Sequence, residues 1–190
     1  NPIGSGDIYG SGAFTGEFDG NGHSITGLRI DVKTLPSGTG TTVYVGLFAN
    51  VTGTVKDLSI TGSINYNRSK DYYIGSIAGT CGGSIENCIN RADVNGTAGS
   101  YDYDGYVGGI AGSATAAAKI LNCVNNGDIS SVCSGGDDYA TSTYVSGIVG
   151  LGNSSTVISN CYNTGNISAS VGCYDKSSYG YASGIAKGAT

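Results

Sequence analysis

The 190-residue chain contains no methionine, and this absence predicts that it is a processed or excised part of a longer polypeptide, which continues at both ends. Charged residues are scarce, at 12%, but hydrophobic residues reach 39%, so the composition is not that of a disordered protein. Nine Lys and Arg stand scattered against 14 Asp and Glu, which argues against nucleic acid and anionic membrane surfaces as partners. No apolar run is long enough to cross a bilayer, so we expect no membrane insertion.

Histidine occurs once, as His23 in the sequence DGNGHSI. A serine or cysteine hydrolase needs a histidine base beside its nucleophile, and a histidine-based zinc site needs more histidines or a Cys-x-x-Cys pair. The chain offers neither arrangement, so we expect no catalytic residues. His23 is predicted to be structural, in a turn that enters a strand.

Glycine is abundant, at 34 residues, but it lacks the every-third-residue period of collagen. Together with many β-branched residues and asparagines, it favours short strands joined by tight turns. The sequence therefore predicts an all-β protein.

A repeat runs through the chain in two registers. The first consists of anchors separated by 30, 30, 35 and 38 residues: Leu28, Leu58, Cys88, Cys123 and Cys161. The second consists of aromatic residues that open segments of the form aromatic-x-Gly/Ser-x-Phe/Ile: Phe14, Tyr44, Tyr73, Tyr106, Tyr144 and Tyr181. We therefore divide the single domain 1–190 into repeats 14–43, 44–72, 73–105, 106–143, 144–180 and a partial repeat 181–190.

Strands repeated at such a period indicate coils stacked one on another, about five in number, in a β-solenoid. Equivalent residues then form ladders along the axis. Aliphatic ladders fill the interior, and hydrogen-bonded ladders are expected for the recurring asparagines Asn87, Asn122, Asn160, Asn90, Asn125 and Asn163. Alternation does not settle which face of the aromatic-x-Gly segments points inward.

Several segments resemble a known family: FTGEFDGNGHSITGLRI (14–30), YVGLFA (44–49), and YVGGIAG (106–112) with KILNCVNNGDI (119–129). They are similar to the GLUG-type repeats of bacterial secreted and cell-surface proteins, some adhesin-like and some like immunoglobulin-A metalloproteases. The resemblance implies a right-handed parallel β-helix and an extracellular or cell-surface location. The zinc motif H-E-x-x-H of those proteases has no counterpart here, so peptidase activity is not implied.

Length differences between repeats should collect in variable loops, at about 65–72, 95–105, 130–143 and 168–180. These loops carry seven tyrosines among Ser, Gly, Asp and Asn: Tyr66, Tyr72, Tyr101, Tyr103, Tyr139, Tyr174 and Tyr179. Tyrosines in such company are typical of binding loops. They could bind a host glycan or a protein along one edge of the solenoid, or they could merely cover loop backbone.

Acidic residues also fall in these loops. Asp102 and Asp104 could help to hold calcium, although no full calcium-loop signature is present. With Asp137 and Asp138, they could instead serve a glycosidase, which needs two carboxylates facing one sugar. The simplest interpretation is that they are solvated loop residues.

The six cysteines divide into groups. The three anchor cysteines replace leucine and are expected to be buried thiols in a ladder. Cys133 and Cys173 occupy equivalent loops of neighbouring coils and could form a disulfide in an oxidising compartment, while Cys81 has no evident partner.

These observations favour a non-catalytic module that supports adhesion or ligand binding through its tyrosine- and aspartate-rich loops. Two alternatives stay open. The module could be a passive spacer, or it could be a carbohydrate-active enzyme that uses loop carboxylates.

Overall fold

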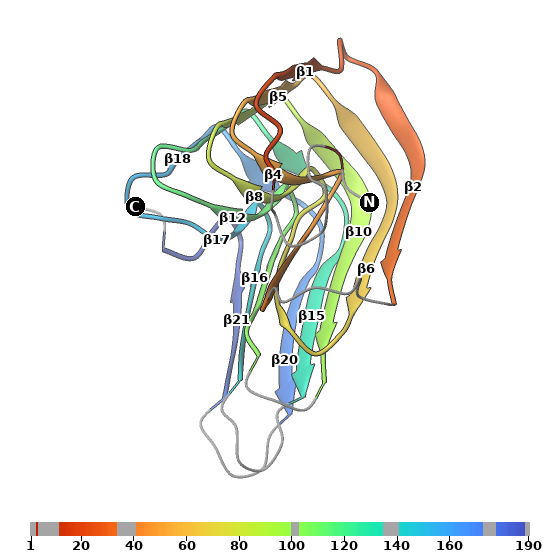
Figure 1. Ribbon diagram of the computed structural model, residues 1–190, viewed down its shortest axis with the longest axis vertical. Helices are drawn as coiled ribbons and strands as arrows, with labels where there is room; N and C mark the ends of the chain where they lie inside the picture. The colour runs from red at the N-terminus through yellow and green to blue at the C-terminus, as the bar shows by residue number, and fades with distance from the viewer. Residues whose placement is uncertain are drawn as a thin grey trace.

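The computed structural model describes residues 3, 12–33, 41–99, 103–134, 141–172 and 178–188. The regular structure of these residues consists of strands alone, in four parallel sheets (Figure 1). The first sheet contains β1 (Glu17–Asp19), β5 (Thr54–Lys56), β9 (Ser84–Glu86), β13 (Lys119–Leu121) and β18 (Val157–Ser159). The second contains β2 (Ser24–Val32), β6 (Ser59–Asn67), β10 (Ile89–Ala98), β14 (Val124–Asn125), β15 (Ile129–Ser134), β19 (Tyr162–Asn163) and β20 (Ile167–Gly172). The third contains β3 (Thr42–Val45), β7 (Asp71–Ile74), β11 (Gly105–Gly108), β16 (Ser142–Ser146) and β21 (Tyr179–Ser183). The fourth contains β4 (Phe48–Val51), β8 (Ala78–Cys81), β12 (Ala111–Ala114) and β17 (Val149–Leu151).

Each coil visits the four sheets in turn, so that β3, β4, β5 and β6 form one coil and β7 to β10 form the next. Four complete coils stack in parallel register, with incomplete coils at both ends. The predicted β-solenoid is therefore confirmed. Over the described ranges, no helix is long and apolar enough to cross a membrane.

One core fills the space enclosed by the first sheet, the fourth sheet and the start of the long strands of the second sheet. The strands β5, β9 and β13 each place only their central residue inward, as Val55, Ile85 and Ile120, and all three are fully buried. Because a strand alternates its side chains, three residues suffice to bury one aliphatic and leave two polar neighbours outside. These aliphatics form one of the interior ladders that the repeat predicts.

Asparagine ladders hold the corner between the first and second sheets. Asn87, Asn122 and Asn160 have φ near +53°, a left-handed conformation that asparagine tolerates better than most residues. Their amides bond along the axis: Asn122 donates to Asn87 at 3.0 Å, and Asn160 donates to Asn122 at 3.2 Å. In a second, inner ladder, Asn90 donates to Asn125, and Asn125 donates to the side-chain carbonyl of Asn163. The predicted asparagine ladders are confirmed.

A second core lies between the long strands of the second sheet and the third sheet. In Figure 1, β6, β10, β15 and β20 run down one side of the molecule, with β16 and β21 opposite them. Val43, Ile64, Ile74 and Val94 are among the fully buried residues between these two sheets. In the third sheet, the residues on either side of Tyr44, Tyr73, Tyr106 and Tyr144 therefore point inward, among them Tyr72, and these four tyrosines lie on the outer face.

The first coil departs from the predicted register. Phe18 takes the place opposite Val55 and Ile25 lies opposite Ile60, so Leu28, after a bulge that follows Ile25, lies opposite Gly62 rather than Leu58. Phe14 bridges to Val51 in the fourth sheet, so it is not the first member of the Tyr44 series. The positive φ angles of Asn21, Gly22 and Gly27 show how the DGNGHSITG segment absorbs the shift. Residue spacing alone had made Phe14 and Leu28 look equivalent to later repeats.

The anchor cysteines behave as predicted. Cys88 and Cys123 are fully buried, Cys161 in the last coil is partly buried, and all three are free thiols. Their sulfurs point toward backbone carbonyls, for example Cys123 Sγ to Leu121 O at 3.2 Å. They serve as small apolar residues in the ladder that Leu58 begins.

Candidate functional site: a tyrosine ladder beside a groove

Two of the seven tyrosines expected in binding loops are core residues instead. Tyr66 and Tyr72 are 1% and 0% exposed, and their rings pack 4.8 Å apart. The loop assignment was wrong here because β6 and β7 extend to residues 67 and 71, which leaves only residues 68–70 as the connection. The alternation of inward residues simply continues through Ile64, Tyr66, Tyr72 and Ile74. Neither ring can reach a ligand in this structure.

Of the remaining tyrosines, Tyr103 is half-buried against the second core and Tyr179 on β21 is 50% exposed. Tyr101, Tyr139 and Tyr174 lie outside the described residues, as do Asp102, Asp137 and Asp138. Ligand binding by these loop residues, and calcium binding by Asp102 with Asp104, therefore stay predictions.

The proposed disulfide involves Cys173, which also lies outside the described residues. Cys133 is a free, fully buried thiol that lies opposite Val171 in the strand register. Its sulfur is 3.4 Å from the hydroxyl of Tyr72, whose pKa is raised well above its usual value by burial. Cys133 thus belongs to the polar centre of the second core rather than to a loop.

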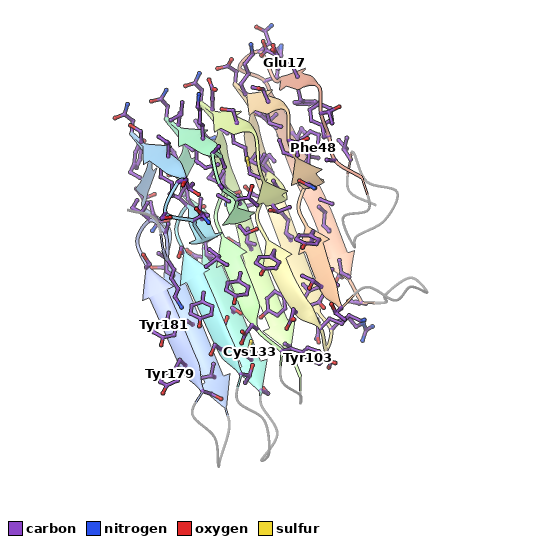
Figure 2. All side chains as sticks on the ribbon, turned by 60° about the vertical axis from the view of Figure 1, so that its left-hand side comes forward. Glu17, Phe48, Tyr103, Cys133, Tyr179 and Tyr181 are labelled. Carbon is purple, nitrogen blue, oxygen red and sulfur yellow. The ribbon has the colours of Figure 1, made fainter. Side chains whose placement is uncertain are left out.

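The outer face of the third sheet carries a stack of aromatic side chains, which we call the tyrosine ladder: Tyr44, Tyr73, Tyr106, Tyr144 and Tyr181. Neighbouring ring centroids are 4.7 to 5.4 Å apart and the planes are within 11° of parallel. Such spacing follows from the separation of adjacent strands, about 4.8 Å. Figure 2 shows Tyr179 and Tyr181 on β21, where the ladder ends.

The ladder rings are partly exposed, unlike the aliphatic residues on the other face of the same strands. Burial, together with neighbouring tyrosines and aspartates, raises the pKa of Tyr73 and of Tyr106. Both phenols therefore stay neutral around pH 7 and present hydroxyl groups that donate as well as accept hydrogen bonds.

A second ladder, of glycines, lets the fourth sheet approach the backbone of the tyrosine strands. A Cβ on Gly79 would lie 2.7 Å from Tyr44 Cβ, one on Gly112 would lie 2.3 Å from Ile74 N, and one on Gly150 would lie 2.7 Å from Val107 N. No side chain fits at these positions. The next residue of each strand, such as Thr80 or Ser113, then faces the tyrosine ladder across a narrow gap.

This gap is a groove of about 300 Å³, which we call the ladder groove. Its lining consists of Tyr44, Tyr73, Thr80, Ser113, Ala114, Thr115, Ala116, Leu151, Gly152 and Asn153. None of these side chains carries a charge, and hydroxyl groups predominate among the polar ones. Ser113 donates a hydrogen bond to Thr80 at 2.8 Å across neighbouring strands, so two hydroxyls lie side by side in the groove wall, between Asn50 and Leu151 in the adjacent strands.

Lys187 takes the place of the glycine ladder in the last coil, since Ala186 bridges to Val149 and Lys187 follows it as Gly150 follows Val149. Its side chain lies on the tyrosine ladder. The Nζ atom is 3.2 Å from the ring centroid of Tyr144 and 4.4 Å from that of Tyr181. The rings thus hold an ammonium group in a cation–π contact.

A polar row flanks the ladder on its other side, two residues earlier on each strand. It includes Asp71, which begins β7, and Asp104, which directly precedes β11. The Asp71 carboxylate accepts a hydrogen bond from the backbone N–H of Asp104 at 2.8 Å, and the Asp104 carboxylate accepts one from Ser142 at 2.9 Å. Within the described ranges, no group of three or more His, Cys, Asp or Glu could hold a metal ion.

The tyrosine ladder was present in the sequence as the series that opens each repeat, but its outward face was not predicted. Alternation fails there because Val, Gly and Ile occupy both faces of the later segments. The glycines and Lys187 were missed, although the series IAG, IAG, IVG and IAK displays them at one repeat position. In this series glycine recurs at the third position, and Lys187 replaces it once. That pattern could have indicated a close approach of two sheets and an unusual lysine.

Residues 103–130 match the family model described as the GLUG motif. This segment therefore matches the GLUG motif that the resemblance had implied. Over 105 residues it is 34% identical to halomucin from Haloquadratum walsbyi, a match that covers 55% of this chain and 1% of halomucin. The chain thus spans about a hundredth of the length of that relative.

Among solved structures, the fold is similar to that of a candidate immunoglobulin A1 protease from Bacteroides ovatus. The TM-score is 0.44 at 19% sequence identity, and the match covers 97% of this chain and 71% of the other.

Proposed function

We propose that this GLUG-repeat β-solenoid is a non-catalytic module of a secreted or cell-surface protein, and that it supports adhesion by binding a polymeric ligand along the tyrosine ladder. The ladder and its groove carry the proposal. The ladder provides tyrosine rings in a row that runs along the solenoid axis, coil after coil, and the groove adds hydroxyls beside Tyr44 and Tyr73.

The extracellular setting is supported by the GLUG repeat and by the similarity to halomucin, a mucin by name. The scarcity of charge agrees with it, since the chain has little to offer nucleic acids or anionic lipids. Relative to the sequence-based hypothesis, the ligand surface moves from the loops to the outer face of the third sheet. The reason is that two of the expected loop tyrosines are buried and the ladder tyrosines are not.

Two alternatives make different predictions. A passive spacer would bind nothing, and the ladder would then only cover the outer face of the sheet. A carbohydrate-active enzyme needs two carboxylates across one groove, and the lining of the ladder groove contains none.

The test is binding of the 190-residue protein to an array of host glycans and mucin-type glycoproteins, with calcium and with chelator. The matched variants are Tyr73→Leu, in the groove, and Tyr162→Leu, which is 55% exposed and lies in the second sheet. Because a contact aromatic contributes strongly to binding, Tyr73→Leu should weaken binding by about tenfold or more. Tyr162→Leu should bind like the parent.

A blank array for the parent protein would favour the passive spacer or a ligand that is not a glycan. Equal binding by both variants would place the site elsewhere. If the parent protein binds with calcium but not with chelator, the result would indicate a calcium-dependent site in the acidic loops.

A further inference from the structure

Lys187 shows what kind of group the tyrosine ladder holds. Its Nζ lies against the rings of Tyr144 and Tyr181, whose centroids are 5.0 Å apart in nearly parallel planes. Parallel rings in contact are about 3.5 Å apart along their normal, so this centroid distance means that they are offset. Each step of the ladder therefore leaves part of a ring face uncovered, and an ammonium group fits there.

The neighbouring steps of the ladder have a similar geometry. Tyr73 and Tyr106 are stacked at 4.7 Å, and Tyr106 and Tyr144 at 5.0 Å. At the repeat position that Lys187 occupies in the last coil, the earlier coils have Gly112 and Gly150, which carry no side chain. The same kind of ring surface thus recurs along the ladder.

Negative charge lies next to these steps. Asp71 and Asp104 stand two residues before Tyr73 and Tyr106, on the same outer face, at about 7 Å along the strand. Their carboxylates are fixed by backbone N–H donors, and they are close enough to the phenols to affect them electrostatically. A carboxylate beside an aromatic face attracts a cation through both groups.

We propose that the central ladder, formed by Tyr73 and Tyr106 with Asp71 and Asp104 beside it, binds lysine or arginine side chains of a partner polypeptide. This rests on the proposed function, because it names the ligand class of the same ladder. A basic polypeptide fits better than a single small cation, since equivalent steps repeat about every 5 Å and can engage several cations together. The net charge of −5 favours the same partner.

The probe is a peptide of alternating Lys and Ser, titrated into the 190-residue protein. Tyrosine fluorescence is the readout, since the chain has 14 tyrosines and no tryptophan, and calorimetry gives the Kd. The double variant Asp71→Asn with Asp104→Asn keeps an acceptor oxygen for each backbone donor and should weaken binding about tenfold, from a few-fold per charge–cation contact.

Its matched control is Asp93→Asn with Asp128→Asn. This pair makes the same change of charge at the second sheet, in β10 and directly before β15, where Asp128 N donates to Asp93 at 3.2 Å and Asn166 N donates to Asp128 at 2.9 Å. Binding should change less than about twofold there, because exposed charges at a distance are screened by salt.

Lys187→Gln provides the opposite test. Removal of the intramolecular ammonium frees another step of the ladder, so the peptide should bind about fivefold more tightly, the worth of one cation–π contact. The inference would be overturned if the two aspartate double variants weakened peptide binding equally, or if Lys187→Gln left the affinity unchanged. Either result would indicate that the peptide is attracted only by the net negative charge of the protein.

The same experiment separates this inference from the proposed function. If glycans bind and depend on Tyr73 while the lysine peptide does not bind, the ladder is a ligand site but not for cations, and the inference fails alone. If neither ligand depends on Tyr73, the proposed function fails as well.

Discussion

Replacement of Asn125 by alanine should be among the most damaging polar substitutions in this protein. Asn125 is fully buried in the inner asparagine ladder, at the corner of the third complete coil. Its amide donates to Gly127 O at 2.8 Å and to Asn163 Oδ1 at 2.6 Å, and its carbonyl accepts from Asn90 Nδ2 at 2.7 Å. Alanine removes all three bonds at once.

The expected loss follows from these contacts. A net hydrogen bond contributes about 1 kcal/mol, and a buried partner left without a bond costs more. Asn90 keeps its bond to Ala92 O, whereas Gly127 O loses the Asn125 side-chain donor. The free energy of unfolding should therefore fall by about 3 kcal/mol or more in Asn125→Ala.

Asn95→Ala is the control, because Asn95 also belongs to a ladder. It donates to Asn65 at 3.1 Å and accepts from Ser130 at 2.7 Å, but on the half-buried outer face of the second sheet. Water can replace these partners, so the loss should stay below about 1 kcal/mol. Urea unfolding followed by far-ultraviolet circular dichroism measures both variants. Similar losses in the two would refute the claim that burial of the ladder decides its contribution.

Two further predictions concern packing and thiol chemistry. Gly112→Ala should prevent native folding or lower the free energy of unfolding by more than about 3 kcal/mol, because the new Cβ would lie 2.3 Å from Ile74 N. Gly172→Ala is the control: its Cβ would have nothing within 4 Å, and the variant should be nearly neutral in the same unfolding assay. A mild effect at Gly112 would show that the third and fourth sheets can separate. Hydrogen bonding from the Cys123 thiol lowers the pKa of Cys161 to about 7, and burial raises the pKa of Cys81 to about 12. The thiolate of Cys161 therefore forms as the pH rises through about 7, and iodoacetamide should label Cys161 far faster than Cys81 at about pH 8. Peptide mass spectrometry of the native protein measures this order, and equal labelling of the two cysteines would contradict it.

The sequence determined the stacking of coils and much of the interior. Val55, Ile85 and Ile120 recur at one position of the repeat, and residues at equivalent positions of stacked coils must form ladders. The buried cysteines and the asparagine ladders followed from the same argument, because each recurs at one position of the repeat and stacking places equivalent positions next to one another. These features depend on local spacing, which the sequence displays directly.

The tertiary structure decided the register of the first coil and the location of the candidate site. Phe14 and Leu28 fit the repeat by spacing, but the strand register gave them other neighbours, Val51 and Gly62. The sequence places Tyr66 and Tyr72 in a loop, but in the structure they lie on β6 and β7 and their rings pack against each other. The ladder groove exists because glycines let one sheet approach the backbone of another, and the contact of Lys187 with Tyr144 joins residues 43 positions apart. Such contacts depend on how sheets are placed in space, and a repeat in the sequence fixes only how each sheet continues along its own axis.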